Sequence, residues 1–379
     1  LANNDSSLDG MIVSHEWGHV LSNRLIGNAN GLGNNQGRSM GEGWSDFVAL
    51  LMTTRPEDAM ATSNPNWTGA FGAAAYSMGP AGDAAYDGIR RYPYSTDFGK
   101  NPLMFRHIQN GVALPATPPP AFGQTGSSNS EVHNSGEVWT NMLWECYVAL
   151  LKDTTRYTFA QASQAMREYL VASLKLTPNN PTMLEARDAV LAAALAKSPK
   201  DFELFARAFA KRGMGVGAEG PVRTSTTHSP VVESTAVGGQ IVVEAVTLDD
   251  SVRSCDDDGI LDNSEHGRLT VRVRNTGTLP IAPTGSIVSE NPALGFPRGA
   301  RISFPTIQPY GSAVARVDLS GAGSALVSAC RASRLVQASD HTPLSIATRT
   351  TRSFARSAPS PPSCTRVTSS ASPIATCAW

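Results

Sequence analysis

The segment VSHEWGHVLSNRL, residues 13–25, carries two histidines and a glutamate at helical spacing. Residues four apart lie on one face of an α-helix, so His15 and His19 can direct their imidazoles at one point, with Glu16 beside it. Zinc binds neutral imidazole nitrogens, but a catalytic zinc site needs three protein ligands and a fourth position for water. The histidines therefore predict only part of a site, and surface or capping histidines on an ordinary helix would give the same pattern.

A carboxylate that could complete the site follows in SMGEGWSDFVAL, residues 39–50. Glu42 opens a second segment with apolar residues at helical spacing, and Asp46 stands one turn further along the same face. Glu42 would complete a His/His/Glu ligand set, and Asp46 could accept the outer N–H of one imidazole and fix its orientation. A solvated acidic edge is the alternative, but Gly41 and Gly43 fit it poorly. Glycines within a helical pattern suggest that another group approaches the backbone closely.

The composition excludes several classes of partner. The chain has 379 residues, with 41% hydrophobic and 17% charged residues and a formal net charge of -1. Nucleic acid is therefore not expected as a partner. No apolar run approaches the ~20 residues of a membrane helix, and the opening LANNDSSLDG lacks the features of a signal peptide. The five cysteines show no CxxC spacing, which argues against a thiolate zinc site or a dense disulfide framework.

Helical patterning runs through about the first 215 residues. Apolar residues recur at threes and fours, and this spacing predicts helices at about 8–26, 39–54, 131–152, 158–174, 181–197 and 200–212. The stretch 55–105 is rich in loops, and ALPATPPPAFGQTGSSNS, residues 113–130, has the composition of coil. We therefore expect a mainly α-helical region at 1–218.

The pattern changes after this region. IVVEAV, LTVRVRN and AVARVDL alternate apolar and polar residues, with Gly, Pro and Asn between them. They predict an all-β sandwich domain at 230–328, after a linker at 219–229. Residues 329–379 are rich in serine, threonine and proline and lose apolar periodicity, so we expect a disordered tail. The predicted fold class is thus multidomain, with a helical portion followed by an all-β domain.

Over about residues 1–215 the sequence resembles the fungalysin-type secreted metallopeptidases and, more distantly, thermolysin. The resemblance rests on five blocks in order, which are HEWGHVLSNRL, MGEGWSDF, GIRRYPYSTDFGKNPLMFRHI, VHNSGEVWTNMLWECY and FELFARAFAKRGMG. It implies a thermolysin-like zinc endopeptidase that acts on protein or peptide substrates. It also implies secretion as a zymogen.

The resemblance assigns roles to single residues. It implies that His15, His19 and Glu42 are zinc ligands, that Glu16 is the general base and that His133 stabilises the transition state. A carboxylate beside a metal-activated water can take its proton and deliver it to the leaving amine. A preorganised donor to the oxyanion is typically worth ~2.7–4 kcal/mol. For His133 the alternative is a polar residue at the start of a helix.

Two further assignments have alternatives. The resemblance implies that Arg90 binds the substrate backbone near the cleaved bond, although GIRRYPY also fits two solvated arginines beside aromatic residues. The carboxylate that should orient His133 is not obvious, and Glu131 is the nearest in sequence. Asp46 is expected to hold one of the ligating imidazoles.

The chain departs from the family at its start. Thermolysin-like domains have a β-rich lobe before the zinc helix, whereas only 14 residues precede His15. We therefore expect part of a longer precursor, with the export signal, propeptide and first lobe upstream, and a zinc helix that exposes apolar surface. The leading hypothesis is a secreted zinc endopeptidase, and the alternative is a non-catalytic extracellular binding or adhesion module on an incomplete peptidase fold. An intact Glu16 favours the enzyme, because metal binding alone needs no general base.

The strand-rich part holds a second candidate metal site in SCDDDGILDNSE, residues 254–265. Its spacing mimics a calcium loop at Asp256, Asp258, Gly259 and Glu265. Ser254 stands where such a loop requires an aspartate, so an acidic turn before a strand is the main alternative. In the first part, calcium could also be held by Asp83, Asp87 and Asp97, although no ligand spacing supports them. Through VRNTGT the β-rich part weakly resembles the immunoglobulin-like accessory modules of secreted enzymes.

Overall fold

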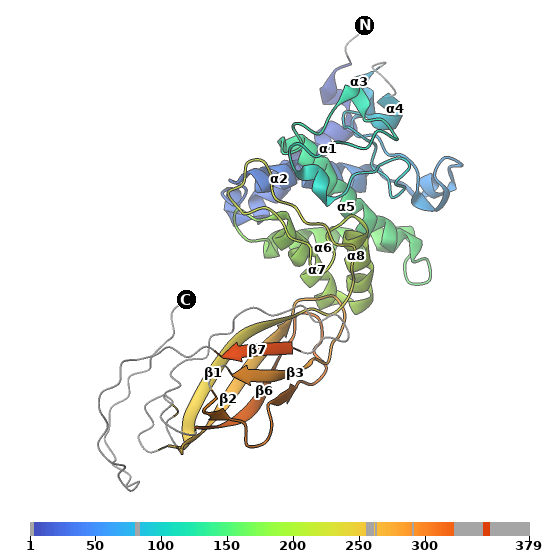
Figure 1. Cartoon of the computed structure of the whole chain (residues 1–379). Coiled ribbons are helices and arrows are strands. Elements are labelled where there is room, and N and C mark those ends of the chain that lie inside the picture. Colours follow the sequence, from blue (N-terminus) through green and yellow to red (C-terminus); the bar gives the residue numbers. More distant parts are fainter. Residues whose placement is uncertain are drawn as a thin grey trace. The chain divides into compact units, whose positions relative to one another are not determined.

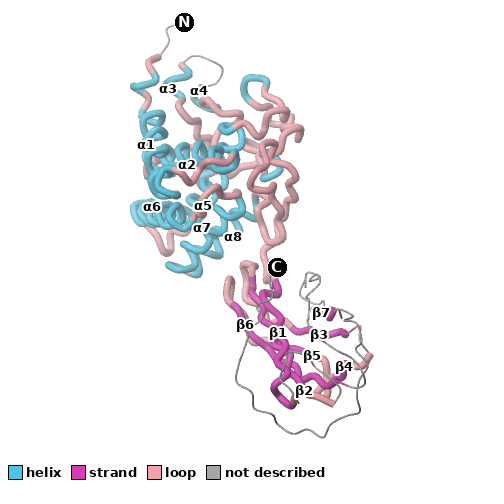
Figure 2. The backbone as a smooth tube through the Cα atoms, turned by 90° about the vertical axis from the view of Figure 1, so that its left-hand side faces the viewer, coloured by secondary structure: helices cyan, strands magenta, loops and turns pink. Residues whose placement is uncertain are grey.

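The computed structural model describes residues 4–79, 84–254, 261, 264–289, 292–321 and 344–348. The chain forms two compact units that divide between Val237 and Gly238. The first unit is helical and the second is built of strands (Figure 1; Figure 2). Among the described residues, none of the helices combines the length and apolar character that crossing a membrane requires.

The α-helices of the first unit are α1 (Gly10–Leu25), α2 (Asn35–Thr53), α3 (Ala75–Met78), α4 (Ala84–Asp87), α5 (Val132–Lys152), α6 (Phe159–Leu176), α7 (Met183–Lys197) and α8 (Pro199–Lys211). The long helices begin at residues whose side chains accept from free backbone amides. Asp9 caps α1, Asn34 caps α2 and Glu131 caps α5 in this way. The six expected helices are present, and the loop-rich stretch adds the short α3 and α4.

The core of the first unit lies around α5. Trp139, Leu143, Cys146 and Leu150, which recur at helical spacing, are all fully buried. The ring of Trp139 packs edge-on against Trp44 of α2, with centroids 5.7 Å apart. Burying a large apolar side chain contributes roughly 1.5–3 kcal/mol, so each of these side chains adds to the stability of the unit. Burial also raises the pKa of the Cys146 thiol, which is free.

The segment 219–229, expected as a linker, packs on the first unit and fastens the start of α2. Asn35 Nδ2 donates to the carbonyl of Thr226 at 3.2 Å, and Gln36 Nε2 donates to the carbonyls of Pro221 and Val222 at 3.2 Å each. A backbone bridge between Glu219 and Val232 joins the start of the segment to the chain just beyond its end. Because these contacts satisfy polar groups at the first turn of α2, residues 219–229 form a clasp rather than a free linker.

The strands of the second unit are β1 (Ile241–Arg253), β2 (His266–Asn275), β3 (Thr284–Ser289), β4 (Leu294–Gly295), β5 (Arg301–Ser303), β6 (Ser312–Gly321) and β7 (Leu344–Thr348). One sheet has the order β1-β2-β6-β4 and the other the order β5-β3-β7. All pairs are antiparallel except β3 with β7. The predicted alternating segments lie in β1, β2 and β6.

Both sheets contribute side chains to one apolar core. Leu269, Val271 and Val273 of β2 point inward at every second position, and Ile287 of β3 and Ile302 of β5 meet them from the other sheet. This alternation follows from the two-residue period of a strand. Of the tail expected to be disordered, the structure describes only 344–348, which form β7, and the rest lies outside the described residues.

Candidate metal centre

The crossing of α1 and α2 brings the two histidines to the glutamate. Gly18 lies at this crossing, where a Cβ atom would stand 2.5 Å from the Cα atom of Ser45. Glycine alone permits so close an approach of two backbones. Ser14, Gly18 and Ser22 are the buried residues of α1, and their spacing of four places them on one narrow face. The HEWGH segment thus contains its own packing residue between the two histidines.

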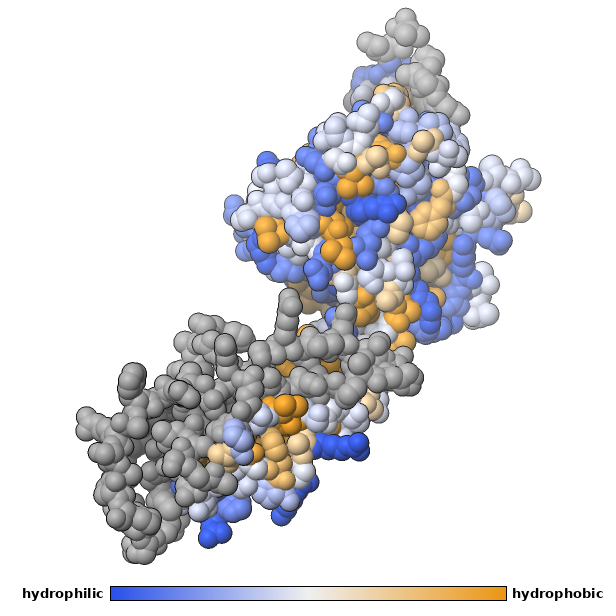
Figure 3. Space-filling view, viewed as in Figure 1, coloured by the Kyte–Doolittle hydropathy of each residue, from blue (hydrophilic) through white to orange (hydrophobic). Residues whose placement is uncertain are grey.

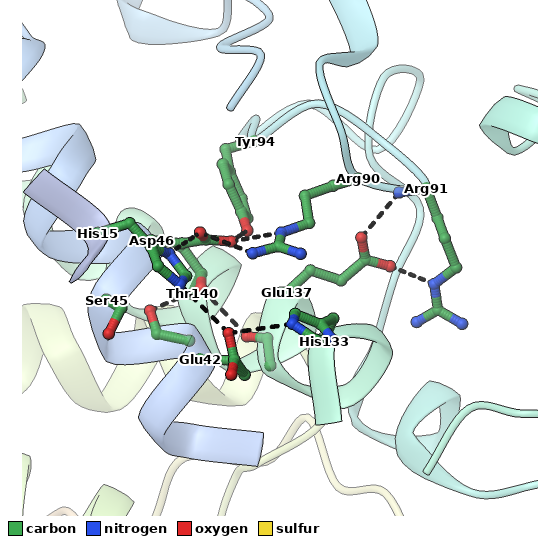
Figure 4. Close-up of polar contacts among 12 residues, drawn as sticks. His15, Glu42, Ser45, Asp46, Arg90, Arg91, Tyr94, His133, Glu137 and Thr140 are labelled. Atoms are coloured by element: carbon green, nitrogen blue, oxygen red, sulfur yellow. Dashed lines mark hydrogen bonds and ion pairs between the residues drawn. The ribbon is translucent and has the colours of Figure 1, made fainter. Parts of the chain in front are cut away.

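Three candidate ligand atoms converge where these helices cross, and Figure 4 shows two of the side chains, His15 and Glu42. His15 Nε2 lies 3.1 Å from His19 Nε2 and 3.2 Å from Glu42 Oε2, and His19 Nε2 lies 3.6 Å from the same oxygen. A tetrahedral zinc ion with bonds of about 2.0–2.2 Å would separate its ligand atoms by about 3.3 Å. The three side chains therefore fit zinc. Within the described part of the chain, no other three His, Cys, Asp or Glu side chains form such a group.

The chemistry of Glu42 also fits a cation. Its Oε2 atom is buried and has no partner with hydrogen-bond geometry among the described residues. A buried oxygen in this state costs free energy unless a cation or a donor meets it. Burial opposes ionisation, but the imidazoles of His15 and His19 hold the pKa of Glu42 well below its usual range. The site thus presents an ionised carboxylate toward the two imidazole nitrogens.

Asp46 connects His15 to the loop that carries Arg90 and Tyr94 (Figure 4). Its Oδ1 lies 2.6 Å from His15 Nδ1 and accepts from Arg90 Nη2 at 2.9 Å, while its Oδ2 accepts from Arg90 Nε at 2.6 Å. The hydroxyl of Tyr94 also donates to Oδ2. Burial opposes ionisation, but Arg90 and His15 hold the pKa of Asp46 well below its usual range. An ionised Asp46 keeps a proton on Nδ1 of His15 and leaves Nε2 directed at Glu42.

These carboxylates also control the charge of His15. Burial by itself would lower the pKa of His15, but the carboxylates of Asp46 and Glu42 outweigh burial and raise that pKa to about 9. The metal-free imidazole is therefore protonated at neutral pH. A metal ion that binds Nε2 must displace this proton.

Arg90, expected to contact the substrate, is only 7% exposed and holds Asp46 through two of its nitrogen atoms. The same side chain lines a cavity beside His15. Its remaining nitrogen, Nη1, makes no hydrogen bond to the residues that the structure describes. One arginine can therefore fix Asp46 and still present a donor to the cavity.

Glu16 and His133 line the same small cavity, which has a volume of about 150 Å³. His133 Nδ1 lies 2.8 Å from Glu131 Oε1, and its Nε2 lies 3.4 Å from Glu42 Oε2. Glu131 also accepts from the backbone amides of His133 and Asn134, which makes it the N-cap of α5. Glu131, the carboxylate nearest in sequence to His133, is thus the one that holds Nδ1 of its ring.

Two features that hold α5 beside the site were missed from the sequence. Glu137 accepts from the backbone amide of Arg91 at 2.9 Å and from its guanidinium, so it ties the Arg90 loop to α5 (Figure 4). Gly136 permits the crossing with α2, since a Cβ atom there would lie 2.9 Å from the Cβ atom of Glu42. The signals were a glycine and a glutamate side by side near the start of a helix.

The close approach predicted at Gly41 and Gly43 of α2 holds at only one of them. A Cβ atom at Gly43 would lie 2.5 Å from the carbonyl oxygen of Gly136. At Gly41 the nearest atom would be Leu32 Cδ1 at 3.7 Å, which is an ordinary contact. Gly43 therefore sets the distance between α2 and α5, whereas Gly41 does not.

The outer face of α1 is apolar and exposed. Trp17 is 58% exposed, and Val13 and Val20, which lie four residues before and three residues after it, are exposed as well. The space-filling view shows apolar side chains scattered among polar ones on one face of the first unit (Figure 3). We call Val13, Trp17 and Val20 the outer stripe of α1.

The candidate calcium sites gain no support. Asp256, Asp258 and Gly259 lie outside the described residues, and Ser254 Oγ donates to Glu265 Oε1 at 3.0 Å. Asp83 also lies outside them, and neither Asp87 nor Asp97 belongs to a group of ligand atoms in the part that the structure describes. Calcium binding stays a prediction.

Comparison with known proteins gives one consistent result. A family model described as fungalysin metallopeptidase matches residues 1–218. The chain is 34% identical over 230 residues to the extracellular metalloproteinase mep of Aspergillus fumigatus, which covers 57% of this chain and 31% of that protein. It is also 34% identical over 239 residues to extracellular metalloproteinase 3 of Trichophyton soudanense, covering 59% and 53%. The chain thus spans about a third of the first relative and about half of the second.

Proposed function

The chain belongs to the fungalysin family of metallopeptidases, and from this premise we propose that its first unit is a zinc-dependent endopeptidase. One observation carries the proposal, namely the separations of 3.1, 3.2 and 3.6 Å among the candidate ligand atoms of His15, His19 and Glu42. The substrates would be proteins or peptides. The extracellular names of the relatives support a secreted protein.

Each polar side chain at the cavity has a distinct part in the proposed reaction. Bound zinc would lower the pKa of a coordinated water and polarise the carbonyl of the cleaved bond. Glu16 would take a proton from the attacking water and then deliver it to the nitrogen of the leaving amine. Its place in the lining of the cavity, next to His15, supports this role.

His133 and Arg90 would act on the carbonyl side of the same step. His133 would donate from Nε2 to the oxyanion that forms on the carbonyl, and Glu131, 2.8 Å from Nδ1, would hold the ring in place. Arg90 would donate from Nη1 to the substrate backbone while its other nitrogens hold Asp46. Asp46 would fix the orientation of His15 and so of one ligand atom.

Zinc content and peptide hydrolysis, measured on matched variants, test the proposal. We expect one zinc per chain, lost in Glu42→Ala and retained in Glu16→Gln. Hydrolysis of casein should disappear in both variants and persist in Glu57→Gln, which alters an exposed glutamate outside the cavity. Hydrolysis that survives in Glu16→Gln would remove Glu16 from the mechanism, and a protein that binds no zinc would overturn the proposal.

A non-catalytic binding module is the second candidate. The outer stripe of α1 favours it, because exposed apolar residues on one helix face are typical of surfaces that contact another molecule. This candidate predicts stoichiometric zinc without hydrolysis by the wild-type chain. The measurement above therefore separates the two functions.

We further propose that the second unit is an immunoglobulin-like accessory module. Its support is the single apolar core that two sheets share. Such a module would bind a substrate or a surface, or space the enzyme from one. Expression of residues 238–379 alone, followed by binding to insoluble protein, would test this role, and a segment that stays unfolded would contradict it.

A further inference from the structure

The cavity beside the candidate ligands is lined in part by apolar side chains. Ile12 of α1, Ala49 of α2 and Ile89 contribute to this lining, as do Ala73 and Ala74. Its volume of about 150 Å³ suits one apolar side chain. Because His15, Glu16, Arg90 and His133 line the same space, a side chain that enters it belongs to a residue flanking the cleaved bond.

A second, larger cavity has a volume of about 670 Å³. Like the small cavity, it is lined by residues of α1, of α2 and of the loop that contains Gly72 and Ala73. Where Ala49 and Ala73 line the small cavity, Leu50 and Gly72 line the large one. The large cavity is more polar, with Thr53, Asp58 and Lys100 in its lining. Met11 alone lines both cavities and therefore lies between them.

We infer that Met11 sets the depth of the substrate side-chain pocket and shuts off the larger cavity behind it. The inference rests on the proposed peptidase function and names a specificity-determining residue for it. A thioether chain has three rotatable bonds and adapts to irregular space, so it can close the end of a pocket without a rigid wall. Substrates with short or medium apolar side chains would fill the pocket, and longer ones would meet the Met11 side chain.

The walls around Met11 are fixed by contacts that do not involve its side chain. Asp9 Oδ1 accepts from the Met11 amide at 2.9 Å, and Asp9 Oδ2 accepts from the Ser77 amide at 2.9 Å. The amide of Ile89 donates to the carbonyl of Ala73 at 3.0 Å. A substitution at Met11 therefore changes the depth of the pocket while the backbone on either side stays in place.

Kinetics on a graded set of peptides give the first test. The peptides differ only in one residue flanking the cleaved bond, which carries an unbranched side chain of increasing length, and each flank is varied separately. Met11→Ala should shift the preferred length toward longer chains by about tenfold in relative kcat/KM, at one flank only. Met11→Phe should shift it toward shorter chains. Met11→Leu, close in volume, and Met52→Ala, an exposed methionine outside both cavities, should keep the wild-type profile.

Binding of single side chains gives a second test that needs neither hydrolysis nor metal. N-acetyl amino acid amides of the same series are titrated into protein with 13C-labelled methionine methyl groups, and the Met11 signal is followed by NMR. Wild-type affinity should stop rising where the pocket ends, whereas in Met11→Ala it should continue to rise by roughly fourfold per methylene.

The two tests distinguish a failure of the inference about Met11 from a failure of the proposed peptidase function. If the wild type hydrolyses nothing, the peptidase proposal fails, and the binding series still decides whether Met11 limits the pocket. An identical length dependence in wild type, Met11→Ala and Met11→Phe would overturn the inference. So would a wild type that already accepts the longest side chain as well as Met11→Ala does.

Discussion

α1 and α2 supply the candidate ligands together, yet the protein holds them in different ways. α2 is buried along most of its length, including Trp44, Phe47 and Leu50. In α1 only small residues are buried, at the single crossing marked by Gly18, and the outer stripe is exposed. α2 is thus fixed by the core, whereas α1 buries only a narrow face of small residues.

The largest loss of stability is expected when a Cβ atom is added to α2, the helix fixed by the core. Gly43→Ala should lower the free energy of unfolding by about 2–3 kcal/mol, because the new methyl group meets the carbonyl oxygen of Gly136 in a core that cannot move aside. Gly41→Ala is the matched control two residues away and should stabilise by up to about 1 kcal/mol through helix propensity. Urea denaturation measures both. Equal effects would mean that α2 is not pinned at Gly43.

A Cβ atom at Gly18 of α1 should lower zinc affinity more than it lowers the stability of the protein. Gly18→Ala would push α1 from Ser45 and separate His15 and His19 from Glu42. We expect zinc affinity to fall by about tenfold or more, comparable to the loss of a partner behind a ligand. Stability should fall by only about 1 kcal/mol, since the exposed side of α1 leaves it room to shift.

A chelator competition measures the zinc affinity of this variant. Gly10→Ala is its control on the same helix, because a Cβ atom there meets nothing within 4 Å. A Gly18→Ala protein that unfolds as readily as Gly43→Ala would contradict the contrast between the two helices.

The proton on His15 should make zinc binding depend on pH. In the metal-free protein the pKa of His15 is raised to about 9, so its charged form adds stability that is complete below about pH 6.5 and is lost as the pH rises through 9. Zinc must displace this proton, so log K for zinc should rise by about one per pH unit between pH 7 and 9 and then level off. Titration calorimetry in buffers of different ionisation enthalpy counts the released proton. A slope of zero would contradict the assignment.

Substitutions in the outer stripe of α1 should have the smallest effect on stability and on zinc affinity. Trp17→Gln should change stability by no more than about 0.5 kcal/mol and leave zinc affinity unchanged, because the ring lies on the exposed side of α1. Binding of a fluorescent hydrophobic dye to the folded protein should decrease. The same substitution at the buried Trp44 should unfold the protein, and a similar loss at Trp17 would show that α1 is held from both sides.

Helical spacing predicted the pairs that lie within one helix, whereas the contacts between distant segments that were predicted rested on side-chain chemistry and on the family resemblance. The spacing of His15 and His19 and of Glu42 and Asp46 lies within single helices, so helical geometry places each pair without knowledge of the fold. The contact of Asp46 with Arg90 joins residues 44 positions apart. No periodicity records such a pairing, because the loop conformation that delivers the arginine depends on the whole unit.

In the second unit, too, the sequence pattern predicted only some of the strands. β1, β2 and β6 are long enough for alternation to reveal them, whereas β5, Arg301–Ser303, is too short to show a period. The parallel strand β7 was missed because its five residues lie in a Ser/Thr/Pro-rich stretch and are defined as a strand by their pairing with β3. Short strands are defined by their partners more than by their own residues.

The integrity of the candidate metal site depends on the clasp at residues 219–229, which lies on the surface. Most of its side chains are exposed, so proteases can reach it, while its carbonyl groups hold Asn35 and Gln36 at the start of the helix that bears Glu42. A single nick there would leave every candidate ligand intact and still loosen the helix that orients one of them. In a mixture of active proteases, cleavage within those eleven residues would therefore shorten the half-life of this site.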